Sequence, residues 1–277
     1  MRQVNDFALA APTEQIANCV FDMLKDRVTF PMKRMGLTSL FSDGLDIAQT
    51  ADFVKILCST YLDKVLQQHL SMWLSDHDLP SWPMPMPLPT TKTFLTSFLN
   101  AKGDPDPKVQ AQLTQSMKLS YHSAIGELIW AMTTCQPDVS CATVRALQYS
   151  CTPHALHYHG VKHILKYLHA TKDDGIFFWQ TTSNEYLPAV SPPAVRSNVH
   201  NLLFDARPSH DPLELHGFVD SDWAACPQTR CSFAGTCLCL AGECVAYKTQ
   251  LLPTVALSST EAEYGCLQLR EYDLIRS

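Results

Sequence analysis

The sequence reads FVDSDWA at residues 218–224 and LSSTEAEY at residues 257–264, and these two stretches determine the fold that we expect. The first predicts a strand that begins near His216 and ends in an acid. The second predicts the start of a helix, because Ser and Thr are followed three residues later by Glu. Between them, residues 232–240 and 243–248 predict a β-hairpin around Ala241-Gly242. The last segment is therefore expected to run strand, hairpin, helix.

The acidic residues of these two stretches have more than one interpretation. A carboxylate at the tip of a strand and another in the first turn of a facing helix can converge on one cation. Ser258 with Glu261, and Thr260 with Glu263, also fit the capping box, in which the glutamate only caps its helix. Asp222 on its own is typical of a turn.

A Pro-rich stretch divides the rest of the chain. The prolines crowded between residues 80 and 89 predict an extended linker, which we place at 78–117, because proline fixes φ and removes a backbone donor. A second polar linker is expected at 181–213. Apolar periodicity predicts helices and strands as follows: a helix at 14–26 capped by Thr13, strands at 45–47 and 53–56, a helix at 60–74, helices at 121–134 and 137–149, a helix that starts with Thr152 as cap and Pro153, and a strand at 175–179.

Several of these segments together resemble the Pol polyproteins of copia-type LTR retrotransposons. Residues 218–224 and 258–264 resemble the SDxDWA and SSTEAEY motifs of the ribonuclease H domain in that family. Further similar stretches are YHSAIGELI at 121–129, QPDV at 136–139, HILKYL at 163–168 and QVNDF at 3–7. The resemblance covers most of the chain outside the two linkers.

The resemblance implies an α/β fold in pieces. Residues 1–77 would be a palm and thumb remnant of the reverse transcriptase, and 118–180 a helical thumb or connection. Residues 214–277 would be the N-terminal half of a ribonuclease H-like domain, a truncated mixed sheet. The parent family is an RNA-directed DNA polymerase with ribonuclease H activity.

The resemblance also implies the site residues. Asp220 would be the strand acid and Glu263 the helix acid, both catalytic and both ligands of Mg²⁺, since ribonuclease H hydrolysis uses two such ions. Asp6 would be a palm acid, but Asn5 stands where the family has the first of two aspartates, and an amide is neutral. The sequence ends before the further acids of the nuclease. We therefore expect a catalytically inactive fragment, with residual hybrid cleavage or nucleic-acid binding as alternatives.

Charge and composition limit the partners. The net charge of −6 does not indicate the basic stripe that a nucleic-acid-binding protein usually carries. Lys162, Lys166 and Lys172 nevertheless form a local positive stretch. An RNA–DNA hybrid or an RNA template is the partner implied by the resemblance. We find no signal peptide and no apolar run long enough to span a membrane, so we expect an intracellular protein, cytoplasmic or nuclear, with reduced cysteines.

Two further groups of side chains are candidates for metal binding. His159 and His163 lie four residues apart on one predicted helix and could hold Zn²⁺, or they could face solvent or nucleic acid. Cys237 and Cys239 alternate on one face of a predicted strand. Core packing or metal and redox chemistry would each explain that pair.

Overall fold

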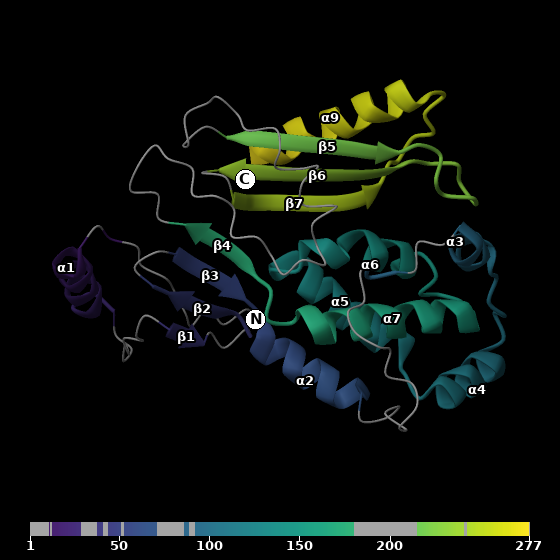
Figure 1. Cartoon of the computed structure of the whole chain (residues 1–277), viewed down its shortest axis with the longest axis horizontal. Helices are drawn as coiled ribbons and strands as arrows, with labels where there is room; N and C mark the ends of the chain where they lie inside the picture. The colour runs from purple at the N-terminus through teal and green to yellow at the C-terminus, as the bar shows by residue number, and fades with distance from the viewer. Residues whose placement is uncertain are drawn as a thin grey trace.

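The protein is described by a computed structural model with two antiparallel sheets and several helices (Figure 1). The described residues are 11, 13–28, 38–40, 44–50, 53–70, 86–88, 92–179, 215–240 and 243–276. Asn5, Asp6 and the predicted linker at 181–213 lie outside them.

The first sheet combines three strands from near the start of the chain with one strand that ends at residue 179. It contains β1 (Thr38–Leu40), β2 (Asp46–Gln49), β3 (Phe53–Leu57) and β4 (Ile176–Trp179), paired in this order. Thr50 closes the β2–β3 turn, because its side-chain oxygen accepts a hydrogen bond from the Phe53 amide at 3.1 Å. Each predicted strand is confirmed. The return of β4 to pair with β3 was not predicted, and it places segments 1–77 and 118–180 in one sheet.

The helices largely follow the predicted pattern. They are α1 (Glu14–Lys25), α2 (Ser59–Leu70), α3 (Lys92–Asn100), α4 (Pro107–Met117), α5 (Tyr121–Thr134), the 3₁₀ turn η1 (Pro137–Val139), α6 (Ser140–Leu147), α7 (Ala155–Thr171) and α9 (Ser259–Arg276). The Thr13 cap of α1 is confirmed, since its hydroxyl accepts a hydrogen bond from the Ile16 amide at 3.3 Å. No residue of α1 is buried, so the predicted apolar face of this helix is not covered by the described residues.

The prediction of an extended linker at 78–117 is wrong for its second half, where α3 and α4 form. Asp106 caps α4 by accepting a hydrogen bond from the Lys108 amide at 2.9 Å, and Pro107 takes the first helical position. The contact of α3 with α7 depends on Gly160. A Cβ atom there would lie 2.5 Å from the Phe98 ring.

The predicted start of α7 is also wrong. The cap is His154 rather than Thr152, and α7 begins at Ala155. The His154 ring accepts a hydrogen bond from the Leu156 amide at 3.2 Å, and Nδ1 of His157 accepts one from the His154 amide at 2.9 Å. A pair of histidines thus plays the part that Ser and Glu take in the usual capping box.

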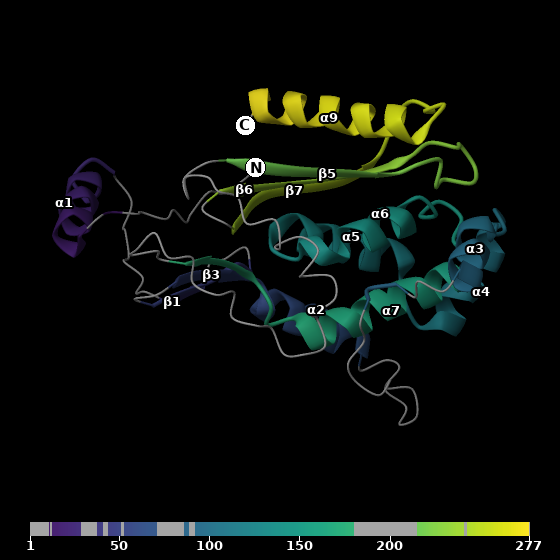
Figure 2. The same ribbon diagram turned by 45° about the horizontal axis from the view of Figure 1, so that its top comes forward.

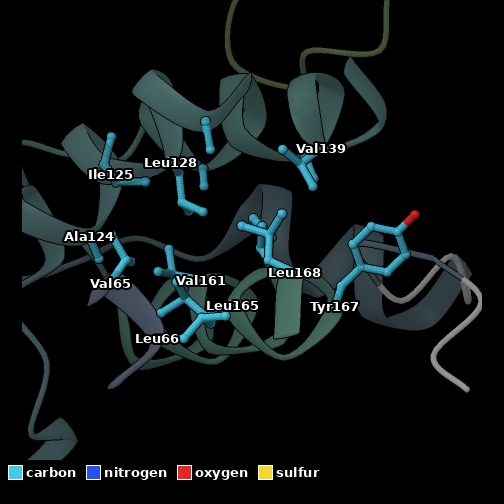
Figure 3. Close-up of a cluster of buried hydrophobic side chains, with 14 of the residues drawn as sticks. Val65, Leu66, Ala124, Ile125, Leu128, Val139, Val161, Leu165, Tyr167 and Leu168 are labelled. Carbon is cyan, nitrogen blue, oxygen red and sulfur yellow. The ribbon is translucent and has the colours of Figure 1, made fainter. Parts of the chain in front are cut away.

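The main hydrophobic core surrounds α7 (Figure 3). Its predicted apolar face is confirmed, since Val161, Ile164, Leu165 and Leu168 are all fully buried. Side chains from α2 and α5 close over this face, among them Val65, Leu66, Ala124, Ile125 and Leu128. Segments from both sides of the Pro-rich stretch therefore share one core.

The second sheet is built by the last segment of the chain. Its strands are β5 (His216–Asp222), β6 (Phe233–Leu240) and β7 (Glu243–Leu251), in this order, and α9 follows. Figure 2 shows α9 over one face of this sheet and α5 and α6 beneath the other. The predicted strand, hairpin and helix are confirmed. The expectation of a mixed sheet is not, because every described pairing is antiparallel and β6 is the only described strand that pairs with β5.

Leu165→Ala should lower the free energy of unfolding by about 2–5 kcal/mol, because it leaves a cavity in the core around α7. Leu147→Ala on α6 is the matched control. That side chain is 39% exposed, so the loss should stay below about 1 kcal/mol. Urea unfolding followed by circular dichroism measures both values. Equal losses in the two variants would contradict the assignment of the core.

Candidate functional site

Asp220 lies near the end of β5, on a strand whose side chains alternate between two environments. Phe218, Asp220 and Asp222 are exposed, whereas Val219 and Ser221 are half-buried. Val219 packs against Cys266 of α9 and its neighbours. Since side chains alternate across a strand, Asp220 belongs to the face of β5 opposite the one that α9 covers.

The two glutamates at the start of α9 make different contacts. Glu261 caps the helix, because its carboxylate accepts a hydrogen bond from the Leu257 amide at 2.6 Å while the Ser258 hydroxyl accepts one from the Glu261 amide at 3.1 Å. Glu263 reaches across to β5, where its Oε1 accepts a hydrogen bond from the Ser221 amide at 3.3 Å. The capping interpretation is therefore confirmed for Glu261.

The first turns of α9 are held close to the Asp220 position. Cys266 is fully buried, and its Sγ lies 3.4 Å from the backbone oxygen of Asp220 and 3.5 Å from that of Gly235. Glu263 thus meets β5 at the residue after Asp220, from the face opposite the one to which the Asp220 side chain belongs, so this arrangement does not by itself bring the two carboxylates together. Among the described residues no group of three His, Cys, Asp or Glu is arranged to hold a metal ion. The ligand roles of Asp220 and Glu263 stay a prediction.

Asp222 is the last residue of β5 and not a simple turn residue. Its Oδ2 lies 2.8 Å from Nη2 of Arg145 on α6. The Arg145 guanidinium also lies 5.1 Å from the centre of the Phe233 ring on β6. This contact links α6 to the acidic end of β5. Nothing in the sequence around Arg145 distinguishes it from other surface arginines, so sequence reasoning missed it.

The segment after β5 is fixed on both sides. The Trp223 indole donates a hydrogen bond to the Ala256 carbonyl at 3.0 Å, just before α9. Gln228 donates to the Leu99 carbonyl of α3 and lies 3.3 Å from the Tyr149 hydroxyl. The end of the strand that carries Asp220 is therefore anchored to the helices before it and to the start of α9.

Two histidines of α7, His157 and His163, bond to backbone carbonyls of other segments. His163 bonds the Met86 carbonyl at 3.1 Å. The pKa values of His159 and His163 are both lowered, mainly by burial. His157 is fully buried, stacks on Tyr149 at 3.8 Å between ring centres and donates from Nε2 to the Phe98 carbonyl at 2.9 Å. Burial lowers the pKa of His157 to about 4.

Three cysteines meet at the turn end of the β6–β7 hairpin. The Sγ atom of Cys237 lies 3.8 Å from that of Cys239 and 3.4 Å from that of Cys244. The sequence alternation had singled out Cys237 and Cys239. Cys244 could have been found by folding the predicted hairpin back on itself, which brings it opposite Cys239.

Comparison with known proteins identifies relatives at modest identity. The chain is 29% identical over 147 residues to secreted RxLR effector protein 161 of Plasmopara viticola, which covers 53% of the chain and 83% of that protein. It is 25% identical over 271 residues to an uncharacterized mitochondrial protein of Arabidopsis thaliana, covering 98% of the chain and 90% of that protein. It is 29% identical over 147 residues to the retrovirus-related Pol polyprotein from transposon TNT 1-94 of Nicotiana tabacum, covering 53% of the chain and 9% of the polyprotein.

These relatives confirm the resemblance inferred from the sequence motifs. The chain is a homologue of copia-type retrotransposon Pol polyproteins, and it matches a small part of their length. No family model matches the chain, and no solved structure matches it. Within the described part of the chain, no helix combines the length and the apolar character that a membrane span requires.

Arg145→Ala should lower the free energy of unfolding by about 1–3 kcal/mol, because it removes both a charged hydrogen bond and the packing of the arginine stem on Phe233. Asp222→Asn should cost less than about 1 kcal/mol, since Asp222 is 58% exposed and solvent screens its charge. A double-mutant cycle by urea unfolding measures the coupling between them. Strictly additive effects would show that the ion pair does not link α6 to β5.

The stability of the protein should fall as the pH drops from about 6.5 towards about 4, partly through His157. Its folded pKa, about 4, lies below the ordinary value of 6.5, so the unfolded chain takes up the proton first and acid favours unfolding. Protonation would also break the cap, because Nδ1 accepts the His154 amide bond.

His157→Gln should remove this part of the pH dependence, up to about 3 kcal/mol across that range. Denaturant midpoints measured between pH 4 and 7 test the expectation. His122→Gln on the exposed surface of α5 is the control and should leave the pH profile as it is in the wild type. If the stability of the His157→Gln variant falls with pH as steeply as that of the wild type, His157 is not the source of this pH dependence.

Proposed function

We propose that this chain is a piece of a copia-type Pol polyprotein with no catalytic activity of its own. Residues 1–180 would derive from the end of the reverse transcriptase, and residues 214–277 from the first half of the ribonuclease H domain. The observation that carries the proposal is the hydrogen bond from the Ser221 amide to Glu263. It brings a helix acid to the residue that follows the strand acid Asp220, and the order of strand acid and helix acid is that of the two motifs that the chain shares with the family.

The expected loss of activity follows from the number of carboxylates. Two-metal hydrolysis stabilises both the attacking and the leaving oxygen, and each Mg²⁺ demands near-octahedral oxygen ligands. Asp220 and Glu263 supply two side chains for this task. At the polymerase end, Asn5 is neutral and leaves Asp6 as the single acid of its pair. We therefore expect weak cation binding without strand cleavage or DNA synthesis.

Nucleic-acid binding by the helical connection is the second candidate function. The observation that favours it is that two lysines of α7, Lys162 and Lys166, lie close enough to His159 for their charges to act on it. After burial, the charges of Lys162 and Lys166 are the causes that lower the pKa of His159. Such a patch attracts phosphates without reading sequence, so its affinity for an RNA–DNA hybrid would fall steeply with salt.

The first experiment measures cation binding by the full chain. Mn²⁺ titrated into the protein and followed by water proton relaxation should show weak binding, on the order of 1 mM, as for sites with few carboxylates. Asp220→Asn and Glu263→Gln should each weaken it several-fold. Glu261→Gln is the matched control, because Glu261 caps α9 and should leave Mn²⁺ binding unchanged. Binding that survives both Asp220→Asn and Glu263→Gln would exclude the site.

The second experiment measures activity on a labelled RNA–DNA hybrid and on a primed RNA template, with Mg²⁺ or Mn²⁺. The wild type should cleave no faster than the Asp220→Asn variant and should extend no primer. Cleavage that disappears in Asp220→Asn would overturn the proposal of an inactive fragment and identify a working nuclease.

A further inference from the structure

The β6–β7 hairpin carries a group of thiols that the candidate nuclease site does not use. Cys237 and Cys239 stand two residues apart on β6, and Cys244 lies near the start of β7. The Sγ of Cys237 lies within 3.8 Å of Cys239 and within 3.4 Å of Cys244. A disulfide needs an Sγ–Sγ distance of about 2.05 Å, so the sulfur atoms of Cys237 and Cys244 would have to approach each other by roughly 1.5 Å.

The backbone of the hairpin suits such a cross-link. Cys239 faces Cys244 directly across the two strands, and the register shifts between Leu238 and Cys239. This irregularity breaks the regular pairing at the point where Cys237 approaches Cys244. Directly opposed residues on antiparallel strands have Cα atoms about 4.5–5.5 Å apart, which lies within the range of natural disulfides. Cys239 therefore meets this backbone condition, whereas Cys237, which pairs with Tyr247, approaches Cys244 diagonally through its side chain.

Access to solvent separates this group from the other close pair of thiols. Cys237 and Cys244 are half-buried, so an oxidant in solution can reach them. Cys58 and Cys135 also contact each other, but they are 0% and 1% exposed in the core. Cys151 is exposed, and it provides an internal reference for a single thiol.

We propose that the β6–β7 hairpin is a thiol–disulfide site in which Cys244 forms a disulfide with Cys237, and in which Cys239 can replace Cys237. The oxidant is a low-molecular-weight disulfide. The Cys244 thiolate attacks one of its sulfurs, forms a mixed disulfide and releases the first small thiol. The Cys237 thiolate then attacks the Cys244 sulfur and releases the second. Both protein protons leave on the two released thiols, and the two electrons reduce the small disulfide.

The order of these two attacks follows from the surroundings of Cys237. The hydrogen bond with Cys239 lowers its pKa, but the contact with Cys244 and burial outweigh it and raise the pKa of Cys237 to about 11. A thiol that stays protonated at neutral pH is a poor first nucleophile. We therefore assign the second attack to Cys237, which lies 3.4 Å from Cys244 and can resolve a mixed disulfide formed there.

The site lies apart from the candidate carboxylates. Cys239 pairs with His216 at the beginning of β5, whereas Asp220 pairs with Gly235 towards the other end of the sheet. A cross-link at the turn end would join β6 to β7 without a contact to Asp220 or Glu263. The inference does not depend on the proposed function, and the two can fail separately.

The experiment incubates the full chain in a glutathione redox buffer, blocks free thiols and digests the protein with trypsin. Cleavage after Arg230 and Lys248 yields one peptide, residues 231–248, that contains Cys231 and the three clustered cysteines. In the wild type this peptide should lose two hydrogen masses, and tandem mass spectrometry should locate the link at Cys237–Cys244. The peptide with Cys151 should carry only a glutathione adduct.

Variants of the full chain separate the roles of the thiols. Cys244→Ser should abolish the internal link, and Cys237→Ser should move it to Cys239–Cys244. Cys231→Ser is the matched control from the same peptide and should keep the Cys237–Cys244 link. A wild-type peptide that stays reduced while Cys151 is modified would overturn the proposal. A link that involves Cys231 would overturn it as well. Both of these outcomes are measured on the wild-type protein, so they do not require any variant to fold.

Discussion

The rest of the structure depends on the burial of one face of α7. Val161, Ile164, Leu165 and Leu168 are fully enclosed, and each such aliphatic side chain contributes about 1.5–3 kcal/mol when it leaves water. Because α2 and α5 close over this face, the segment before the Pro-rich stretch and the segment after it cannot fold independently. The same helix then delivers the chain to β4, which pairs with β3. Its other end is tied to α3 through the bond from His157 to Phe98.

The second sheet depends on this helical body at two positions. β7 packs against α6, and Arg145 of α6 holds Asp222 at the end of β5. On the opposite face, α9 attaches through Cys266 and through Glu263. The strand that carries Asp220 is thus fixed between two layers of helices (Figure 2). Such a support would hold a carboxylate at the strand edge in a defined position, which a cation site requires.

Local patterns in the sequence predicted most elements, whereas contacts between distant residues could not be predicted. The alternation around Ala241-Gly242 and the capping residues at Ser258 are local, and the structure has them. The two histidines that cap α7 were missed because histidine is rarely a capping residue, and α3 and α4 were missed because nearby prolines outweighed a weak periodicity. The β3–β4 pairing and the Arg145–Asp222 ion pair depend on the tertiary fold. One sequence, without variation between relatives, contains no signal for these contacts.

The pairing of β3 with β4 has a consequence for how the chain is made. Ile56 of β3 lies opposite Ile176 of β4. During synthesis β3 therefore stays unpaired on this side until the helices between the two strands have left the ribosome. During this interval its backbone donors and acceptors face water, and they are open to other strands. Contacts between residues far apart along the chain also slow folding, since a long loop must close before they form. Because the chain is synthesised from its N-terminus, β3 therefore has an unpaired edge until α7 and β4 have been made and have folded against it. During that time the strand of another polypeptide could pair with this edge.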